Sequence, residues 1–219
     1  MPISQHPPQL ICFDMDDTLI QGNSWLRFNL ALGVSQVEDD QLYARFAAGE
    51  IDYAEWIAAL HELYRLPRPE IDRAFVQTVL SDVSLVDGAA NTLTHIHQAG
   101  ITTALITGSF RTTATAVATQ LNIPHVYANT DCVYKDQGQL THLVAQGDEG
   151  AGKLAYVEEL CRQRGLTITQ DVMIVGDSSN DIPAFLATKQ GVTFDFASSK
   201  VQAAARSVVP TLSDIIQLI

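Results

Sequence analysis

Short apolar runs alternate with helical patterns over most of this chain of 219 residues. An apolar run of roughly four to eight residues between turn signals is typical of a buried strand. The strands predicted on this basis are Leu10–Asp14, Thr102–Thr107, Pro124–Asn129, Val172–Val175 and Val192–Phe194. The pattern over Asp131–Val144 predicts a hairpin that turns at Asp136-Gln137-Gly138.

Helical periodicity fills the intervals between these strands. We expect helices at Ala89–Ala99, Arg111–Leu121, Gly152–Arg164, Ile182–Thr188 and the end of the chain. Strands that alternate with helices form a parallel sheet that is covered on both faces. The predicted fold class is therefore α/β, a three-layer sandwich of helices around a parallel sheet.

This alternation is interrupted between the first and second predicted strands, where helical segments follow one another. They are Ser24–Leu32, Gln36–Ala48, Tyr53–Tyr64 and Glu70–Leu80. Asp52 followed by Glu55 is a capping-box pattern at the start of the third segment. We interpret residues 21–84 as an inserted helical domain and residues 1–20 and 85–219 as the core domain.

Composition narrows the class of protein further. With 47% hydrophobic and 17% charged residues, the chain suits a globular domain with a sizeable core. A formal net charge of −12 argues against nucleic acid and anionic membrane surfaces as partners, since both need basic surfaces. No apolar run is long enough for a membrane span, and the N-terminus lacks a signal-peptide pattern. The three scattered cysteines suit a reduced compartment, so we expect a cytoplasmic protein.

Polar side chains end three of the predicted strands. The first strand runs into FDMDDTL, which contains Asp14 and Asp16, the second ends in Thr107-Gly108-Ser109, and Val172–Val175 runs into GDSSND. In a parallel sheet these ends lie at one edge, where ligands bind. Asp14 and Asp16 are two residues apart, so they share a side of an extended segment.

Carboxylates gathered in this way need a compensating cation. Asp177 and Asp181 add negative charge from another strand end, and no histidine or cysteine lies near them in sequence. Oxygen ligands favour a hard cation, and Mg²⁺ suits a few carboxylates with water and phosphate. Any one of these aspartates alone would more simply be a helix cap or a turn former. The whole set favours a metal site.

FDMDDTL, LITGS, the downstream Lys153 and GDSSND together resemble the four motifs of the haloacid dehalogenase-like hydrolase superfamily. The resemblance covers nearly the whole chain and implies a Rossmann-like core. The insertion lies where that family places its C1-type cap, and Thr107 to Lys153 leaves no room for a second cap. The chain is most similar to the phosphoserine phosphatase-like branch.

The resemblance implies a role for each acid. Asp14 would be the nucleophile that forms an aspartyl-phosphate, and Asp16 the general acid and then the general base. Mg²⁺ would be held by the carboxylates of Asp14 and Asp177 and the backbone carbonyl of Asp16. Asp181 would support the metal or its water ligands.

The same resemblance assigns phosphate-binding roles. Thr107 and the Gly108 amide would bind phosphate oxygens, and Lys153 would neutralise charge on the transferred group. Asn180 would orient the phosphate or its loop. Without the resemblance, Lys153 would most simply be a solvated helix lysine, although its glycine-rich setting opens a helix that can approach an anion.

The implied function is a Mg²⁺-dependent phosphomonoesterase acting on a small phosphorylated metabolite, with phosphoserine-like compounds as candidates. Phosphoserine phosphatases carry a glutamate nine residues after the nucleophile, whereas this chain has Asn23 there, a weaker partner for an ammonium group. Arg27 and Arg45 are candidates for a carboxylate-binding arginine. A phosphotransferase and a non-catalytic regulatory module remain alternatives, and a monomer or a homodimer is expected.

Overall fold

The computed structural model describes residues 7–65 and 71–219. Within these residues, one sheet has seven strands in the order β4-β3-β2-β1-β5-β6-β7. The strands are β1 (Leu10–Phe13), β2 (Thr102–Phe110), β3 (His125–Tyr134), β4 (Leu140–Ala145), β5 (Val172–Val175), β6 (Gly191–Phe194) and β7 (Ser207–Val209). All neighbouring pairs are parallel except β3 with β4, which is antiparallel.

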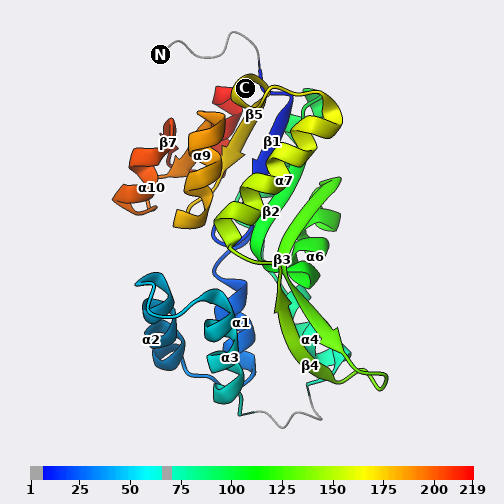
Figure 1. Cartoon of the computed structure of the whole chain (residues 1–219). Coiled ribbons are helices and arrows are strands. Elements are labelled where there is room, and N and C mark those ends of the chain that lie inside the picture. The colour runs from blue at the N-terminus through cyan, green and yellow to red at the C-terminus, as the bar shows by residue number, and fades with distance from the viewer. Residues whose placement is uncertain (1–6, 66–70) are drawn as a thin grey trace.

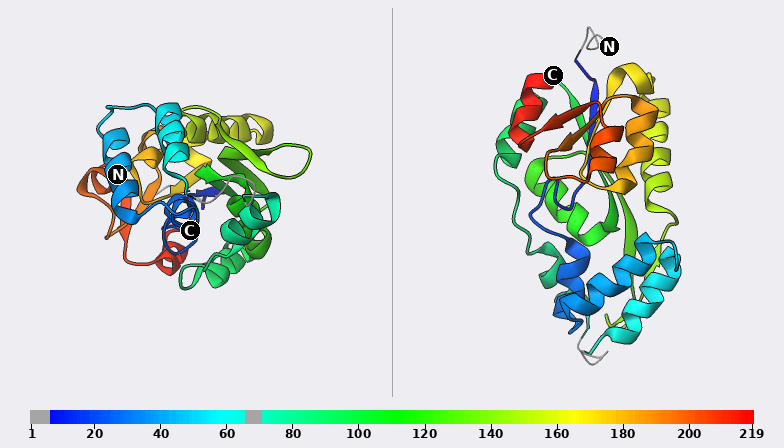
Figure 2. Two further views of the ribbon diagram at one scale, coloured as in Figure 1. Left: turned by 90° about the horizontal axis from the view of Figure 1, so that it is seen from below. Right: turned by 90° about the vertical axis from the view of Figure 1, so that its left-hand side faces the viewer.

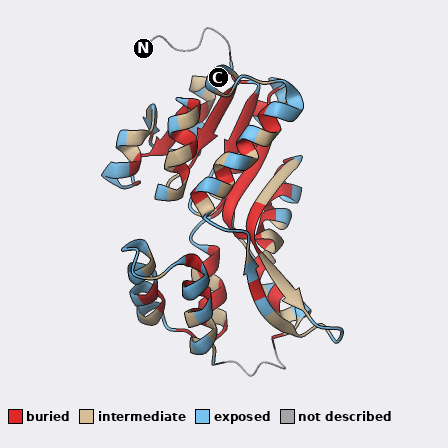
Figure 3. Cartoon of the chain, viewed as in Figure 1, coloured by how far each residue is buried: buried red, intermediate tan, exposed pale blue. Residues whose placement is uncertain are grey.

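The central strand β1 is buried on both faces, because β2 and β5 flank it and helices cover it (Figure 3). Ile11 and Phe13 join the apolar cluster on one face, and Leu10 and Cys12 join the cluster on the other. This alternation follows from the two-residue period of a strand. A continuous apolar run therefore suits a strand that is buried on both faces, and the buried strand predicted over Leu10–Asp14 is confirmed as β1.

Two helical layers enclose the sheet (Figure 2). One face packs against α5 (Ala89–Gln98), α6 (Arg111–Leu121) and the 3₁₀ helix η3 (Leu212–Leu218). The other packs against α7 (Glu149–Arg164), α9 (Ile182–Thr188) and α10 (Ser199–Ala204). The short helices α8 (Ile168–Asp171) and η2 (Ser179–Asp181) flank β5 in sequence.

Helices α1 (Ser24–Ala31), α2 (Gln36–Ala47), α3 (Tyr53–Leu63) and α4 (Arg73–Ser81) form the helical block between β1 and α5. In Figure 1, α1, α2 and α3 lie below the sheet and α4 lies beside the β3–β4 hairpin. Their shared apolar cluster includes Trp25, Phe28 and Leu60 together with Phe110 of β2 and Leu143 of β4. The block is therefore anchored on the lower part of the sheet by apolar contacts.

The chain enters and leaves this helical block at adjacent positions. Ile20 forms an antiparallel bridge with Leu85, and the Gln21 amide donates to the Ser84 carbonyl at 2.8 Å. The two crossing segments thus lie side by side. The division into a core of residues 1–20 and 85–219 and a cap of residues 21–84 stays a prediction.

The α/β fold class predicted from the sequence is confirmed, and most elements agree within a few residues. The predicted segment Pro124–Asn129 and the first arm of the hairpin are one strand, β3, and the antiparallel β4 makes the sheet mixed. The fourth helix begins at Arg73, because Asp72 caps it by accepting from the Phe75 amide at 2.8 Å. Its predicted start, Glu70, lies outside the described residues.

The prediction of a single terminal helix was wrong. The last part of the chain contains α10, the edge strand β7 and the 3₁₀ helix η3. β7 has three residues and only one of them is buried, so it carries no apolar pattern that a sequence could reveal.

Candidate active site

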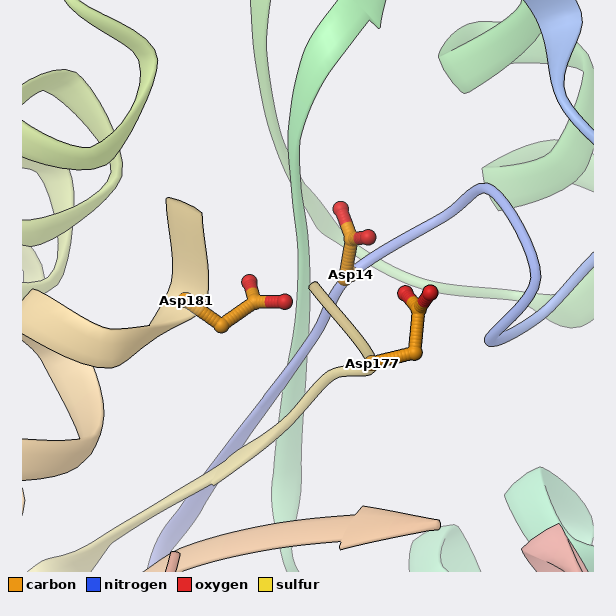
Figure 4. A group of neighbouring side chains, drawn as sticks. All are labelled: Asp14, Asp177 and Asp181. Atoms are coloured by element: carbon orange, nitrogen blue, oxygen red, sulfur yellow. The ribbon is translucent and has the colours of Figure 1, made fainter. Parts of the chain in front are cut away.

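Three aspartates from two neighbouring strand ends surround one space (Figure 4). Asp14 follows β1, and its amide donates to the Val175 carbonyl at 2.8 Å, which fixes it beside the end of β5. Asp177 follows β5, and Asp181 ends η2. One carboxylate oxygen from each of the three lies within 4.8 Å of the others. The sequence prediction that these acids meet at the edge of the sheet therefore agrees with the geometry.

Lys153 of α7 lies behind these acids and is completely buried. Its Nζ donates to Asp14 Oδ1, Asn180 Oδ1 and Asp181 Oδ1, each at 2.7 Å. Burial by itself lowers the pKa of Lys153, but the adjacent carboxylates of Asp14 and Asp181 raise it above its usual range. The lysine is therefore a fixed positive charge rather than the solvated surface residue that its sequence alone suggests.

One lysine does not balance the negative charge of this cluster. Burial and the nearby Asp14 and Asp181 raise the pKa of Asp177 to about 8. Burial also raises the pKa of Asp181 to about 6, with Lys153 opposing the shift and Asp14 adding to it. Burial and the charge of Asp14 both disfavour the ionised forms of Asp177 and Asp181, and a bound divalent cation would stabilise those forms. The all-oxygen donor set fits Mg²⁺.

Asp16 is held by Ser24, the first residue of α1. Its Oδ1 accepts from the Ser24 amide at 3.0 Å, and its Oδ2 accepts from the Ser24 hydroxyl at 2.8 Å. The same hydroxyl shares a short hydrogen bond with Ser109. Burial and then the charge of Asp14 raise the pKa of Asp16 to about 7, although the Ser24 hydrogen bonds oppose this. A carboxyl group with a pKa near neutrality can both donate and accept a proton.

The Thr107-Gly108-Ser109 segment occupies the carboxyl end of β2. Thr107 accepts from the Ser109 amide at 3.1 Å, and the Gly108 carbonyl accepts from the Tyr53 hydroxyl at 3.2 Å. A Cβ at Gly108 would lie within 3.0 Å of the Glu149 carboxylate. A larger residue at this strand end would therefore have to displace the Glu149 carboxylate from the first turn of α7.

The GDSSND turn is tied to both neighbouring elements. Asn180 accepts from Lys153 and from the Ser178 hydroxyl at 2.8 Å, and it donates to Glu149 Oε2 at 2.8 Å. A Cβ at Gly176 would lie within 3.0 Å of the Asp181 carboxyl group. The glycine of the motif is therefore required for Asp181 to reach Lys153.

A cavity of about 230 Å³ opens over these residues. Of the residues singled out from the sequence, those that line it are Asp14, Asp16, Asn23, Thr107, Gly108, Asp177 and Asn180. Lys153 and Asp181 are buried and do not line the cavity. Lys153 contacts Asp14 and Asn180, which do line it, and Asp181 contacts Lys153. The structure thus brings the predicted nucleophile, metal ligands and phosphate-binding residues to one place.

Asn23 and the two candidate arginines have other partners. Asn23 caps α1, because its Oδ1 accepts from the Leu26 amide at 3.1 Å. Arg27 donates to the Asp82 carbonyl at 2.6 Å, and Arg45 pairs with Glu50 at 3.6 Å. Neither arginine lies among the residues that line the cavity.

Sequence reasoning missed several residues of the site. Ser24, Ser109 and Glu149 contact the predicted residues directly, as described above. The signal of Ser24 and Glu149 was weak, since serine and glutamate are ordinary residues at helix starts. Ser109 had no signal of its own beyond its place in LITGS. Trp25 and Trp56 belong to the apolar cluster of the helical block, and both also line the cavity.

A model of the haloacid dehalogenase-like hydrolase family matches residues 8–187. The chain belongs to this family. The segments that resemble the family motifs are FDMDDTL, LITGS, Lys153 and GDSSND. Residues of the three longer segments line the cavity, and Lys153 contacts two of them, Asp14 and Asn180. Within residues 7–65 and 71–219, no helix of this haloacid dehalogenase-like hydrolase is long and apolar enough to cross a membrane.

Curated relatives of this hydrolase are phosphoserine phosphatases. The probable phosphoserine phosphatase of Schizosaccharomyces pombe is 27% identical over 215 residues, which cover 96% of this chain and 70% of that protein. The phosphoserine phosphatase of Archaeoglobus fulgidus is 27% identical over 188 residues, covering 85% of this chain. The chain spans only about half of the Archaeoglobus protein, 52% of its length.

Solved structures share the fold. A phosphoserine phosphatase captured as a phospho-aspartyl intermediate analogue superposes with a TM-score of 0.80 at 21% identity, covering 98% of this chain and all of that one. A haloacid dehalogenase family hydrolase of Salmonella enterica gives a TM-score of 0.83 at 19% identity, covering 100% of this chain and 72% of the other. These similarities extend over the helical block as well as the sheet.

Proposed function

We propose that this chain is a Mg²⁺-dependent phosphomonoesterase that acts on a small phosphorylated metabolite through an aspartyl-phosphate on Asp14. The observation that carries the proposal is the contact of Asp14 with a buried lysine, beside two further acids, at the floor of a cavity. The ammonium group of Lys153 lies 2.7 Å from Asp14 Oδ1, and aspartate carboxylates act as nucleophiles in covalent phosphoryl transfer. The phosphoserine phosphatase relatives support this reaction class.

In the first step, a carboxylate oxygen of Asp14 attacks the phosphorus atom. A bond forms between Asp14 and phosphorus while the bond from phosphorus to the alcohol oxygen breaks. Asp16 donates its proton to that oxygen, which a carboxyl group with a pKa near 7 can do at neutral pH. The products of this step are the free alcohol and the aspartyl-phosphate.

In the second step, water attacks the phosphorus atom of the aspartyl-phosphate. Asp16, now ionised, accepts a proton from the water molecule, and the bond between phosphorus and Asp14 breaks. Inorganic phosphate leaves, and Asp16 is again protonated. The single acid is therefore reset with each turnover.

The remaining residues position the phosphoryl group. Thr107 and the Gly108 amide would bind its oxygens at the end of β2, Lys153 would balance its charge, and Asn180 would orient it or its loop. Asp14, Asp177 and the Asp16 carbonyl would hold Mg²⁺, with Asp181 in support. When bound, the metal ion supplies positive charge that lets an anionic nucleophile approach an anionic phosphate.

The test is phosphate release from a panel of phosphorylated metabolites with Mg²⁺ present, with O-phosphoserine among them. Wild type is expected to hydrolyse at least one compound, and Asp14→Asn none. A wild-type protein that is inactive on every phosphoester, or an Asp14→Asn variant as active as wild type, would contradict the proposal. Products formed with added alcohols would instead identify a phosphotransferase.

The folded protein also gives a test that needs no substrate. Beryllium fluoride with Mg²⁺ mimics a phosphoryl group on an aspartate, so it should raise the melting temperature of the wild type but not of Asp14→Asn. An equal response of the two proteins would favour a non-catalytic module.

We further propose that the protein is cytoplasmic, with reduced thiols, and that it is a monomer or a homodimer. Light scattering after size exclusion would distinguish the monomer from the homodimer.

A further inference from the structure

The wall of the cavity that the helical block contributes is acidic and aromatic. It is made of Trp25 of α1, of Asp39, Asp40, Tyr43 and Phe46 of α2, and of Trp56 of α3. Across the described residues 7–65 and 71–219, no lysine, arginine or histidine lines the cavity. The part of a substrate that projects from the phosphate toward this wall therefore meets negative charge and aromatic rings.

The arginines described in the helical block are all engaged elsewhere. Arg65 pairs with Glu38, and Arg73 lies over the Tyr134 ring at 4.2 Å. Arg27 and Arg45 have the partners given above and lie outside the cavity. Arg68 lies outside the described residues. A carboxylate on the substrate would therefore enter this space with no described cationic partner, which is costly.

The aromatic residues of the wall contact one another. The ring centroids of Trp25 and Trp56 are 4.6 Å apart, and those of Phe46 and Trp56 are 5.6 Å apart in a stacked pair. Aromatic rings attract a cation electrostatically, and the attraction grows when the cation is partly removed from water. A cation near these rings would gain from them as well as from the aspartates.

The two aspartates of the wall differ in their surroundings. Asp39 is buried and accepts from Asn29 Nδ2 at 2.6 Å, so it is already hydrogen-bonded within the block. Asp40 is exposed and forms no ion pair with any residue in the described part of the chain. Asp40 is therefore the carboxylate that is free to meet a positive charge on a ligand.

We propose that the substrate is the phosphomonoester of an amino alcohol, which carries an ammonium group and no carboxylate. The phosphate would lie over Asp14, and the ammonium, primary or quaternary, against Asp40 and the rings of Trp25, Phe46 and Trp56. This inference rests on the proposed phosphomonoesterase function and names its substrate class. It disfavours O-phosphoserine as the substrate, because its carboxylate would meet no cationic side chain among the described residues that line the cavity.

The kinetic test compares substrates that differ in one property. Phosphocholine and 3,3-dimethylbutyl phosphate have the same shape, but only the first is cationic. Phosphoethanolamine and O-phosphoserine differ by the carboxylate. We expect kcat/KM to be about tenfold higher for phosphocholine than for its neutral isostere, and about tenfold higher for phosphoethanolamine than for phosphoserine.

A variant assigns the preference to the wall. Asp40→Asn should reduce the ratio of kcat/KM between phosphocholine and its isostere by about threefold or more, since one of the two attractive elements is lost. Glu62→Gln removes an exposed carboxylate of α3 that does not line the cavity, and it should leave the ratio unchanged. An unchanged ratio in Asp40→Asn, or a preference for phosphoserine, would overturn the inference while leaving the phosphomonoesterase proposal intact.

Fluorescence gives a readout that needs no turnover. The two tryptophans of the chain, Trp25 and Trp56, both line this cavity. Choline should therefore change the tryptophan emission of the wild type in a saturable way, whereas 3,3-dimethylbutanol at equal ionic strength should not. If the cation and its neutral isostere titrate alike, the ammonium site is wrong even if phosphoesters are hydrolysed. A choline-specific change in emission without hydrolysis of any phosphoester would contradict the proposed phosphomonoesterase function but support the ammonium site.

Discussion

Lys153 is the residue on which the charge balance of the site depends. It has no exposed surface and contacts Asp14 and Asp181 at 2.7 Å each. A buried charge that loses its partner is more costly than a buried pair is favourable, because the remaining charge is left without compensation. The stability of the metal-free protein should therefore depend on this one side chain.

We expect Lys153→Met to lower the free energy of unfolding by about 3 kcal/mol when Mg²⁺ is removed by a chelator. Urea denaturation followed by circular dichroism would measure this. Lys200→Met removes an exposed lysine of α10 and is the matched control. Equal midpoints and slopes for the two variants would mean that the buried lysine does not compensate the acids.

Asp16 allows a second prediction at this scale, because its proposed role is specific to the leaving group. Asp16→Asn cannot donate a proton, so kcat for an alkyl phosphate should fall about 100-fold or more. p-Nitrophenyl phosphate releases a stable phenolate that needs no proton, so its first step should be much less affected. Single-turnover measurements of alcohol release would compare the two substrates. Equal losses on both would point to a structural role for Asp16 through its contacts with Ser24.

At the scale of elements, the turn between β5 and α9 determines where Asp181 lies. Gly176 has no room for a Cβ because the Asp181 carboxyl group occupies that space. A side chain there has to displace the acid or the turn. The same strand end carries Asp177, so the geometry of two acids depends on one glycine.

Gly176→Ala should therefore weaken Mg²⁺ binding by about tenfold and destabilise the fold by about 1–3 kcal/mol. Calorimetric titration with Mg²⁺ and urea denaturation would measure the two effects. Gly191→Ala is the matched control, because its Cβ would collide with Phe185 in the apolar core, away from the acids. That variant should lose stability alone, and a similar loss of Mg²⁺ affinity in it would show that the effect of Gly176→Ala is not local.

The elements that could be predicted from the sequence are those with a clear local pattern. LICF and VMIV are continuous apolar runs, and both are buried central strands. Asp52 and Glu55 form the capping box that their spacing indicated. By contrast, β7 is too short to show a pattern. β3 is longer than its own apolar run indicates, because its first half pairs with β2 and its second half with β4.

The residues of the site also differ in how far their positions could be predicted from the sequence. The proximity of the motif residues that follow strands could be predicted, because parallel strands have their carboxyl ends at one edge of the sheet. Glu149 and Asp40 could not, because each reaches the cavity through the packing of a helix whose position no local pattern indicates. The burial of Lys153 likewise could not be predicted from the sequence, since it depends on the packing of α7 against the sheet.

For the whole molecule, the distribution of charge matters most. The chain carries a formal net charge of −12, and several of its acids are concentrated around one cavity. A bound divalent cation would relieve repulsion that the folded state otherwise retains. Metal binding and folding stability should therefore be coupled.

We expect Mg²⁺ at about 100 times its dissociation constant to stabilise the wild type by about 2.7 kcal/mol. For a chain of this size, the melting temperature should rise by about 5–10 °C. Differential scanning calorimetry with and without a chelator would measure the shift. Asp177→Asn should abolish most of it, whereas Asp136→Asn in the hairpin turn should not. A shift that both variants retain would mean that Mg²⁺ binds elsewhere.

The hydrogen-bonded pair of crossing segments at Ile20 and Leu85 has an evolutionary and practical consequence. Since Gln21 and Ser84 lie at adjacent backbone positions, we expect that the helical block between them could be replaced by another without distorting the sheet. Such an exchange would expose Phe110 and Leu143 of the sheet, because the helices that would be removed cover them. A helical block taken from another enzyme would therefore need apolar side chains that cover Phe110 and Leu143. Exchanging the block would then change both the substrate preference and the solubility of the protein.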